Sequence, residues 1–138
     1  MTAIKPDTFL QSLERCRKDE KFMERFYEHF MASSPAIREK FAKTDWQRQY
    51  RMIVESFEIM VQAQARGTEN DPELWRIAVL HGDHGHKILG WMYENWLESL
   101  LKAVKETDPQ YDEDIDLVWH RTMSQGIAFM KARRFEKP

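Results

Sequence analysis

Hydrophobic residues recur along most of this chain at spacings of three and four, the period of an α-helix that buries one face. Phe22, Phe26 and Phe30 follow this spacing, as do Ile53 and Phe57. No segment alternates strictly between apolar and polar residues, as a half-buried strand would. The pattern therefore predicts an all-α fold.

Prolines, glycines and capping residues divide the pattern into seven or eight expected helices. The first helix is expected to open at Pro6 and Asp7, the second follows Asp19 as its cap, and residues 33–35 precede a short third. The fourth covers about residues 45–66 and stops at Gly67, and the fifth is capped by Asp71, has Pro72 in its first turn and ends at Gly82 and Gly85. Two closing helices are expected over about residues 89–105 and 112–133. We expect the closing helices to pack together through apolar residues, namely Tyr93, Trp96, Leu97, Leu100 and Leu101 against Val118, Trp119, Met123, Ile127 and Met130.

Length and composition restrict the class of protein. With 138 residues the chain suits a single domain over residues 1–138. Its 21 basic and 23 acidic residues are interspersed, so it lacks the basic stripe of a nucleic-acid-binding protein. It has neither an apolar run long enough to span a membrane nor a signal-peptide pattern, and the lone Cys16 fits a reducing compartment. We therefore expect a cytoplasmic protein with no nucleic-acid or membrane partner.

The stretch RIAVLHGDHGHKI, residues 76–88, holds three of the five histidines. His81 follows Ile77 by four positions and therefore shares its apolar helical face. A neutral imidazole can bind a metal ion through one ring nitrogen while a hydrogen bond holds the other. Without further context such a histidine is more often a core residue than a ligand. His84 is the alternative ligand, although Gly82 interrupts the helix before it.

Several landmarks give the chain a resemblance to the globin family. Pro35 and Phe41 in SSPAIREKF have the spacing of the globin proline that opens the third helix and the phenylalanine that wedges the haem. IAVLH, ending at His81, resembles the segment of the proximal histidine, and Tyr27 stands where many bacterial globins have a distal tyrosine. SPAIREKFAKTD, MYENWLESLLKAVKETDP and GIAFMK resemble short single-domain bacterial globins related to sensor globins and to flavohaemoglobin globin domains.

The resemblance implies a globin fold, a three-over-three helical sandwich around a haem pocket, with haem b (iron protoporphyrin IX) as cofactor and His81 as its metal ligand. The other haem contacts that it implies are Tyr27, Phe41, Gln49, Ile53, Ile77, His86, Ile88 and Tyr93, with His86 as a contact of a propionate. Leu80 replaces the serine of muscle globins, so we expect the His81 imidazole to bind a backbone carbonyl instead.

On the distal side, Tyr27 and Gln49 can each donate a hydrogen bond to a bound diatomic gas. Gln49 lies one helical turn before Ile53 and so flanks an apolar face. Alternatives stay open for both residues. Tyr27 can be a core aromatic bonded to a backbone carbonyl, and Gln47 or Arg48 can face inward in place of Gln49.

The function implied is reversible binding of dioxygen, nitric oxide or carbon monoxide at ferrous iron, for storage, sensing or redox detoxification. Two alternatives remain: a haem-free sensor or interaction module, and a nitric-oxide dioxygenase or peroxidase served by a separate reductase. FMKARRF, residues 129–135, lacks the acid with which flavohaemoglobins polarise the proximal histidine, which disfavours peroxidase-like iron. A gas-binding protein is therefore favoured over an enzyme, and a homodimer stays open.

Overall fold

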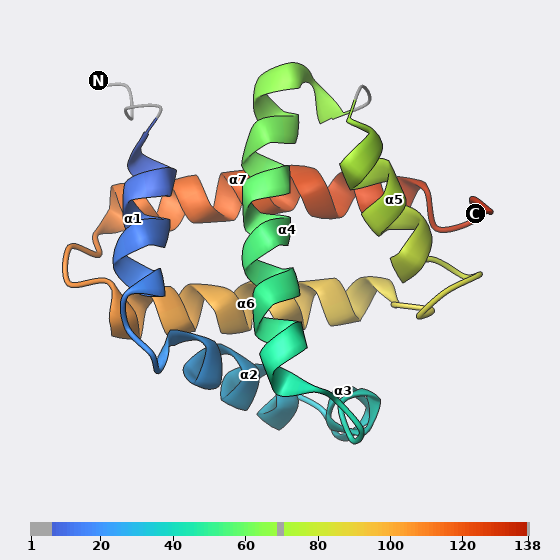
Figure 1. Ribbon diagram of the computed structural model, residues 1–138, viewed down its shortest axis with the longest axis horizontal. Coiled ribbons are helices and arrows are strands. Elements are labelled where there is room, and N and C mark those ends of the chain that lie inside the picture. The colour runs from blue at the N-terminus through green and yellow to red at the C-terminus, as the bar shows by residue number, and fades with distance from the viewer. Residues whose placement is uncertain (1–6, 69–70, 138) are drawn as a thin grey trace. The chain divides into compact units, whose positions relative to one another are not determined.

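The computed structural model describes residues 7–68 and 71–137, and seven α-helices but no strand lie in these ranges. The helices are α1 (Thr8–Arg17), α2 (Phe22–Ala32), α3 (Pro35–Lys40), α4 (Trp46–Arg66), α5 (Pro72–His81), α6 (Gly90–Thr107) and α7 (Glu113–Ala132) (Figure 1). The all-α prediction is confirmed. Pro6, expected to open the first helix, lies outside the described residues. No described helix combines the length and the apolar character that crossing a membrane requires.

Side-chain caps begin three helices near the predicted boundaries, and the cap at Asp71 was itself predicted. Ser34, Asp45 and Asp71 each accept a hydrogen bond from a backbone N–H in the first turn of α3, α4 and α5, respectively. Gly67 follows the last residue of α4 with φ at 89°, in the left-handed region that favours glycine. These residues fix where the chain changes direction.

The prediction of Asp19 as the cap of the second helix is wrong. Its carboxylate accepts the Lys21 N–H at 2.9 Å and pairs with Arg25 at 3.0 Å, whereas α2 begins only at Phe22. An aspartate that bonds the N–H two residues later closes a turn of its own. Asp19 therefore stabilises the turn before α2 and not its first turn.

The described chain divides into two compact units. The first contains the residues up to Lys43 and Asn95–Arg121, which include α1, α2, α3 and the adjoining parts of α6 and α7. The second contains Thr44–Glu94 and the residues from Thr122 onward, which include α4, α5 and the other ends of α6 and α7. A single domain over residues 1–138 stays a prediction.

Aromatic rings form the core of the first unit. The ring centroids of Phe9 and Phe22 lie 4.6 and 6.4 Å from that of Trp119, and Phe26 meets Trp96 edge-on at 5.7 Å.

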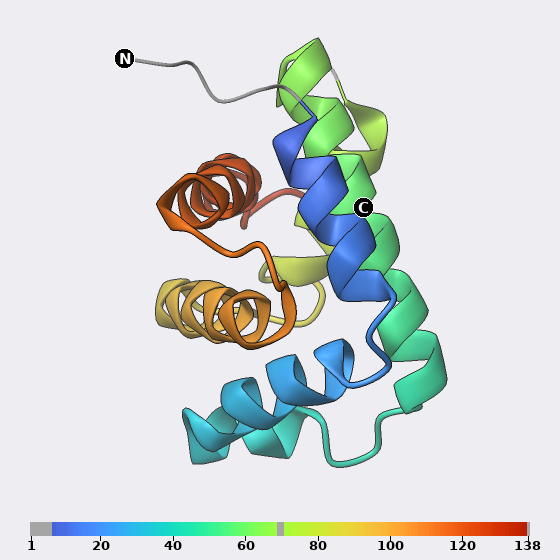
Figure 2. The same ribbon diagram turned by 90° about the vertical axis from the view of Figure 1, so that its left-hand side faces the viewer.

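Within this unit the ends of α6 and α7 run antiparallel beside each other (Figures 1 and 2). Of the residues predicted for the closing pair, the buried ones are Tyr93, Leu100, Trp119, Met123, Ile127 and Met130, and the half-buried ones are Trp96, Leu97, Leu101 and Val118.

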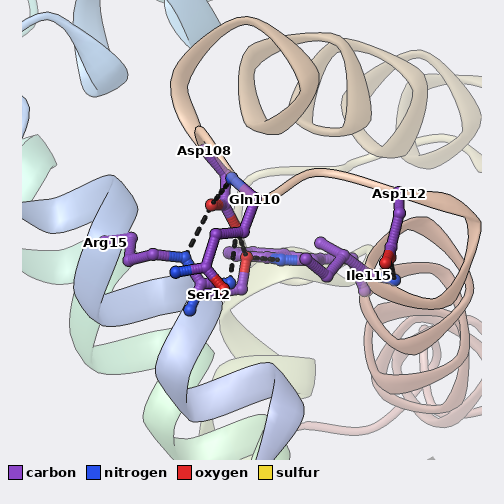
Figure 3. Close-up of polar contacts among 7 residues, drawn as sticks. Ser12, Arg15, Asp108, Gln110, Asp112 and Ile115 are labelled. Carbon is purple, nitrogen blue, oxygen red and sulfur yellow. Dashed lines mark hydrogen bonds and ion pairs between the residues drawn. The ribbon is translucent and has the colours of Figure 1, made fainter.

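A buried polar network ties α1 to the α6–α7 connection (Figure 3). Asp108 accepts from Ser12 Oγ and Arg15 Nε, both at 2.6 Å, and Ser12 Oγ accepts the Trp119 indole N–H at 2.8 Å. Burial opposes ionisation of Asp108, but the hydrogen bonds from Arg15 and Ser12 outweigh it and hold its pKa below the usual value. The carboxylate is therefore charged and satisfied although it is fully buried.

In the second unit, α5 packs beside the C-terminal half of α4 (Figure 1). Phe57, Met60 and Ala63 of α4 and Leu74 and Ala78 of α5 are buried. Of the two apolar residues whose spacing predicted the buried face of the fourth helix, Phe57 is buried and Ile53 is half-buried. The helix spacing therefore identified the buried faces of both elements.

Candidate functional site

His81 is the last residue of α5. Its Nδ1 lies 2.8 Å from the Ile77 carbonyl oxygen, one helical turn earlier, and a neutral imidazole donates its Nδ1–H there. The expected hydrogen bond to a backbone carbonyl is thus present. It fixes the ring orientation and leaves the Nε2 lone pair for another partner.

Burial sets the protonation state of His81. Loss of solvation lowers its pKa, the Ile77 carbonyl raises it by a lesser amount, and the nearby His86 lowers it further, so the net shift is downward from 6.5. The ring is therefore neutral at pH 7. Metal coordination requires a neutral imidazole.

His86 and Tyr93 lie next to the His81 ring. Their ring centroids are 5.9 and 6.5 Å from that of His81, at interplanar angles of 78° and 34°. Tyr93 is buried, and burial raises the pKa of its hydroxyl to about 12, so it is neutral. His86 is exposed, whereas Ile77 is buried and Ile88 half-buried. The second unit thus brings the rings of His81, His86 and Tyr93 together, and backbone groups of Ile77 and Ile88 bond to His81.

Backbone hydrogen bonds hold the segment after α5 in place. The N–H groups of residues 86–88 donate to the carbonyls of residues 80–82 at 2.8–3.0 Å. These carbonyls end the helix and have no partner within it. His84 is exposed and belongs to this segment, outside α5, so it does not continue the helical face of His81.

Close backbone approaches explain the two glycines of this segment. A Cβ on Gly85 would lie 2.2 Å from the Leu80 carbonyl oxygen, and one on Gly82 would lie 2.5 Å from that of Arg134. Both distances are far below van der Waals contact, so a side chain does not fit without a backbone shift. The sequence predicted these glycines as helix stops, and their role in packing comes from the structure.

A C-terminal anchor at this segment was not predicted. The Asp83 N–H donates to the Arg134 carbonyl at 2.7 Å, and the Arg134 guanidinium lies 3.6 Å from the Asp83 carboxylate. Aspartate and arginine are common on protein surfaces, so neither residue stands out in the sequence. No periodicity links Asp83 to Arg134, which are far apart along the chain. The sequence therefore carried no signal for this contact.

Tyr27 and Phe41 meet in the first unit. Tyr27 is 2% exposed, and its ring meets that of Phe41 edge-on, with centroids 5.5 Å apart and planes at 70°. Phe30 contacts the same phenylalanine at 5.8 Å. The α2–α3 corner thus joins the two aromatic landmarks of the sequence, and Tyr27 is packed as both of its alternative roles require.

Gln49 and Ile53 lie one turn apart on α4, and both are half-buried. Gln47 and Arg48, the alternative inward-facing residues, are exposed. Burial therefore favours Gln49 among the three polar side chains at this position.

A solved structure is similar to nearly the whole of this chain. It is a protein from Pseudomonas aeruginosa PAO1, described as structurally highly homologous to a human haemoglobin. The TM-score is 0.88 at 35% sequence identity, and the match covers 95% of this chain and 98% of that chain. The chain belongs to the globin family. The fold predicted for this globin is thereby confirmed, although no family model and no curated protein matched it.

Proposed function

We propose that this globin binds haem b through His81 and reversibly binds dioxygen or another diatomic gas. The observation that carries the proposal is the state of His81, a neutral and half-buried imidazole whose Nδ1 is bonded to the Ile77 carbonyl. Haem, when bound, supplies a ferrous iron that takes up a diatomic gas reversibly.

The donor set around His81 fits one axial ligand. We assign Nε2 of His81 as the metal donor and Ile77, Ile88 and Tyr93 as further haem contacts. We assign His86, which is exposed next to the His81 ring, to a haem propionate, because a histidine N–H can donate to a carboxylate at a solvent-facing edge.

We assign the distal donors to Tyr27 and Gln49, with Phe41 and Ile53 as apolar haem contacts. A phenol O–H and a carboxamide N–H both donate to a gas that carries partial negative charge. The edge-on contact of Phe41 restricts the Tyr27 ring and so limits the directions in which its hydroxyl can point.

The finer assignments rest on the sequence resemblance. The relation to sensor globins and to flavohaemoglobins is such an assignment, whereas a cytoplasmic location and a separate reductase for any turnover stay predictions. A carrier, store or sensor is favoured over a peroxidase, because residues 129–135 contain no acid to polarise His81.

Absorption spectroscopy tests the proposal. The chain expressed with haem supply is expected to carry one haem, and its ferrous spectrum is expected to shift reversibly with carbon monoxide. His81→Ala is expected to lose stable haem binding, whereas His84→Ala, a matched change at an exposed histidine, is expected to retain the spectrum. A chain that stays colourless contradicts the proposal, and the reverse result for the two variants moves the ligand to His84.

A further inference from the structure

A pocket of about 370 Å³ lies between α2 and α6 in the first unit. Six polar side chains line it, namely His29, Ser33, Asn95, Glu98, Ser99 and Lys102. None of them is assigned to haem, and the sequence did not single out this group. The pocket is therefore separate from the gas-binding proposal.

Ser99 is the buried residue among the polar side chains that line the pocket. It is 3% exposed, and no hydrogen-bond partner of its hydroxyl is found among the described residues. Since no fully enclosed polar side-chain atom in the described part of the chain lacks a partner, this hydroxyl is open to the pocket. A hydroxyl that faces the pocket can therefore bond to a molecule that enters it.

The walls of the pocket are fixed by contacts between α2 and α6. Asn95 Nδ2 donates to Ser33 Oγ at 3.2 Å, and Ser33 Oγ donates to the Phe30 carbonyl at 2.6 Å. His29 Nε2 lies 2.5 Å from a Glu106 carboxylate oxygen. A site whose walls are already bonded loses little entropy when a ligand enters.

The charges of the pocket indicate the kind of ligand. Lys102 Nζ and Glu98 Oε1 are 3.5 Å apart, and both side chains are more than half exposed, so their ion pair is weak and easily exchanged. No phenylalanine, tyrosine or tryptophan lines the pocket, and Ala32 is its apolar lining residue. The lining thus offers one positive charge, one negative charge and several polar groups.

We propose that this pocket binds a free α-amino acid in its zwitterionic form. Its carboxylate bonds to the Lys102 ammonium and the Ser99 hydroxyl, and its ammonium bonds to the Glu98 carboxylate. A ligand with both charges replaces the weak Lys102–Glu98 pair by two charge-assisted contacts, whereas a ligand with one charge leaves Lys102 or Glu98 without a new partner.

Amide NMR of the full chain as purified tests this proposal, with L-serine as the probe. Serine is expected to shift signals of residues 29–33 and 95–102 in a saturable manner. Serinamide lacks the carboxylate and N-acetylserine lacks the ammonium, so each is expected to bind about tenfold more weakly. Absence of saturable shifts up to solubility, or equal binding of the three compounds, overturns the proposal.

Variants locate the site. Lys102→Met is expected to weaken serine binding about tenfold, and Ser99→Ala about threefold to tenfold. Lys105→Met is the matched control, because Lys105 is on the same helix but does not line the pocket. Circular dichroism checks the fold of each variant, and the exposed Lys102 decides the result if Ser99→Ala unfolds. Equal weakening by Lys105→Met overturns the assignment.

Discussion

At the scale of single residues, burial and hydrogen bonding separate the roles that the sequence left open. His81 is neutral and held by a carbonyl, whereas His84 is exposed on a turn. Gln49 is more buried than Gln47 and Arg48. For Tyr27, burial alone does not distinguish a core aromatic from a distal donor, because both are packed in the same way.

Replacement of Tyr27 by phenylalanine distinguishes these roles. If the hydroxyl donates to dioxygen, its loss costs about 1.5–3 kcal/mol, and dioxygen release becomes roughly tenfold to a hundredfold faster. Carbon monoxide carries less charge, so its release is expected to change far less. Flash photolysis and stopped-flow measurements give both rates.

Tyr111→Phe provides the control, since it removes a tyrosine hydroxyl that bonds to Asp116 on α7. This variant is expected to leave the release of both gases unchanged. An unchanged rate of dioxygen release in Tyr27→Phe makes Tyr27 a core aromatic and leaves Gln49 as the assigned distal donor.

At the scale of elements, the sequence predicted what local chemistry determines. Asp45 and Asp71 cap helices with their side chains and Gly67 adopts a positive φ, so the limits of α4 and the start of α5 were predicted correctly. Periodicity shows which helical face is buried but not what covers it. The bond between Ser12 and Asp108, 96 positions apart, therefore had no signal in the sequence.

The segment after α5 is sensitive to added volume. Gly85→Ala places a Cβ against the Leu80 carbonyl, so the backbone must move, and we expect a loss of about 1–3 kcal/mol in the free energy of unfolding. Gly90→Ala is the control, because its Cβ meets only the end of the Lys131 side chain at 3.9 Å. Urea unfolding that shows equal stability of the two variants contradicts the tight packing of this segment.

Asp108 makes the attachment of α1 dependent on pH. Its pKa is lower in the folded chain than in the unfolded chain, so its stabilising effect is complete above the unfolded value of 3.8 and is lost as pH falls through the folded value. We expect Asp108→Asn to lower the free energy of unfolding at pH 7 by about 3 kcal/mol, the lower end for a broken buried ion pair because Arg15 is partly exposed.

Asp114→Asn is the control for this prediction, since Asp114 is an exposed acid in the first turn of α7. Acid titrations followed by circular dichroism compare the variants with the parent chain. The difference between Asp108→Asn and the parent is expected to shrink below pH 3.8, and a difference that stays constant down to the acid transition contradicts the linkage.

At the scale of the whole molecule, the residues assigned to haem are divided between the two units. His81, His86 and Tyr93 lie together in the second unit, and the Tyr27–Phe41 contact lies in the first. The assignment of both groups to one haem rests on the sequence resemblance to globins. Periodicity and capping signals predict the elements of each unit, but a cofactor that joins residues distant in sequence leaves no periodic signal.

Hydrogen exchange with and without haem tests whether both units hold the cofactor. A ligand that binds the folded chain stabilises it by about 2.7 kcal/mol when its free concentration is a hundred times its Kd. Haem is therefore expected to slow amide exchange in α5 and in the α2–α3 corner together, because contacts are assigned in both units. His81→Ala serves as the control and is expected to show neither change. Protection confined to the second unit would retain His81 as the ligand but contradict the assignments of Tyr27 and Phe41, and with them the prediction of a single domain around the haem.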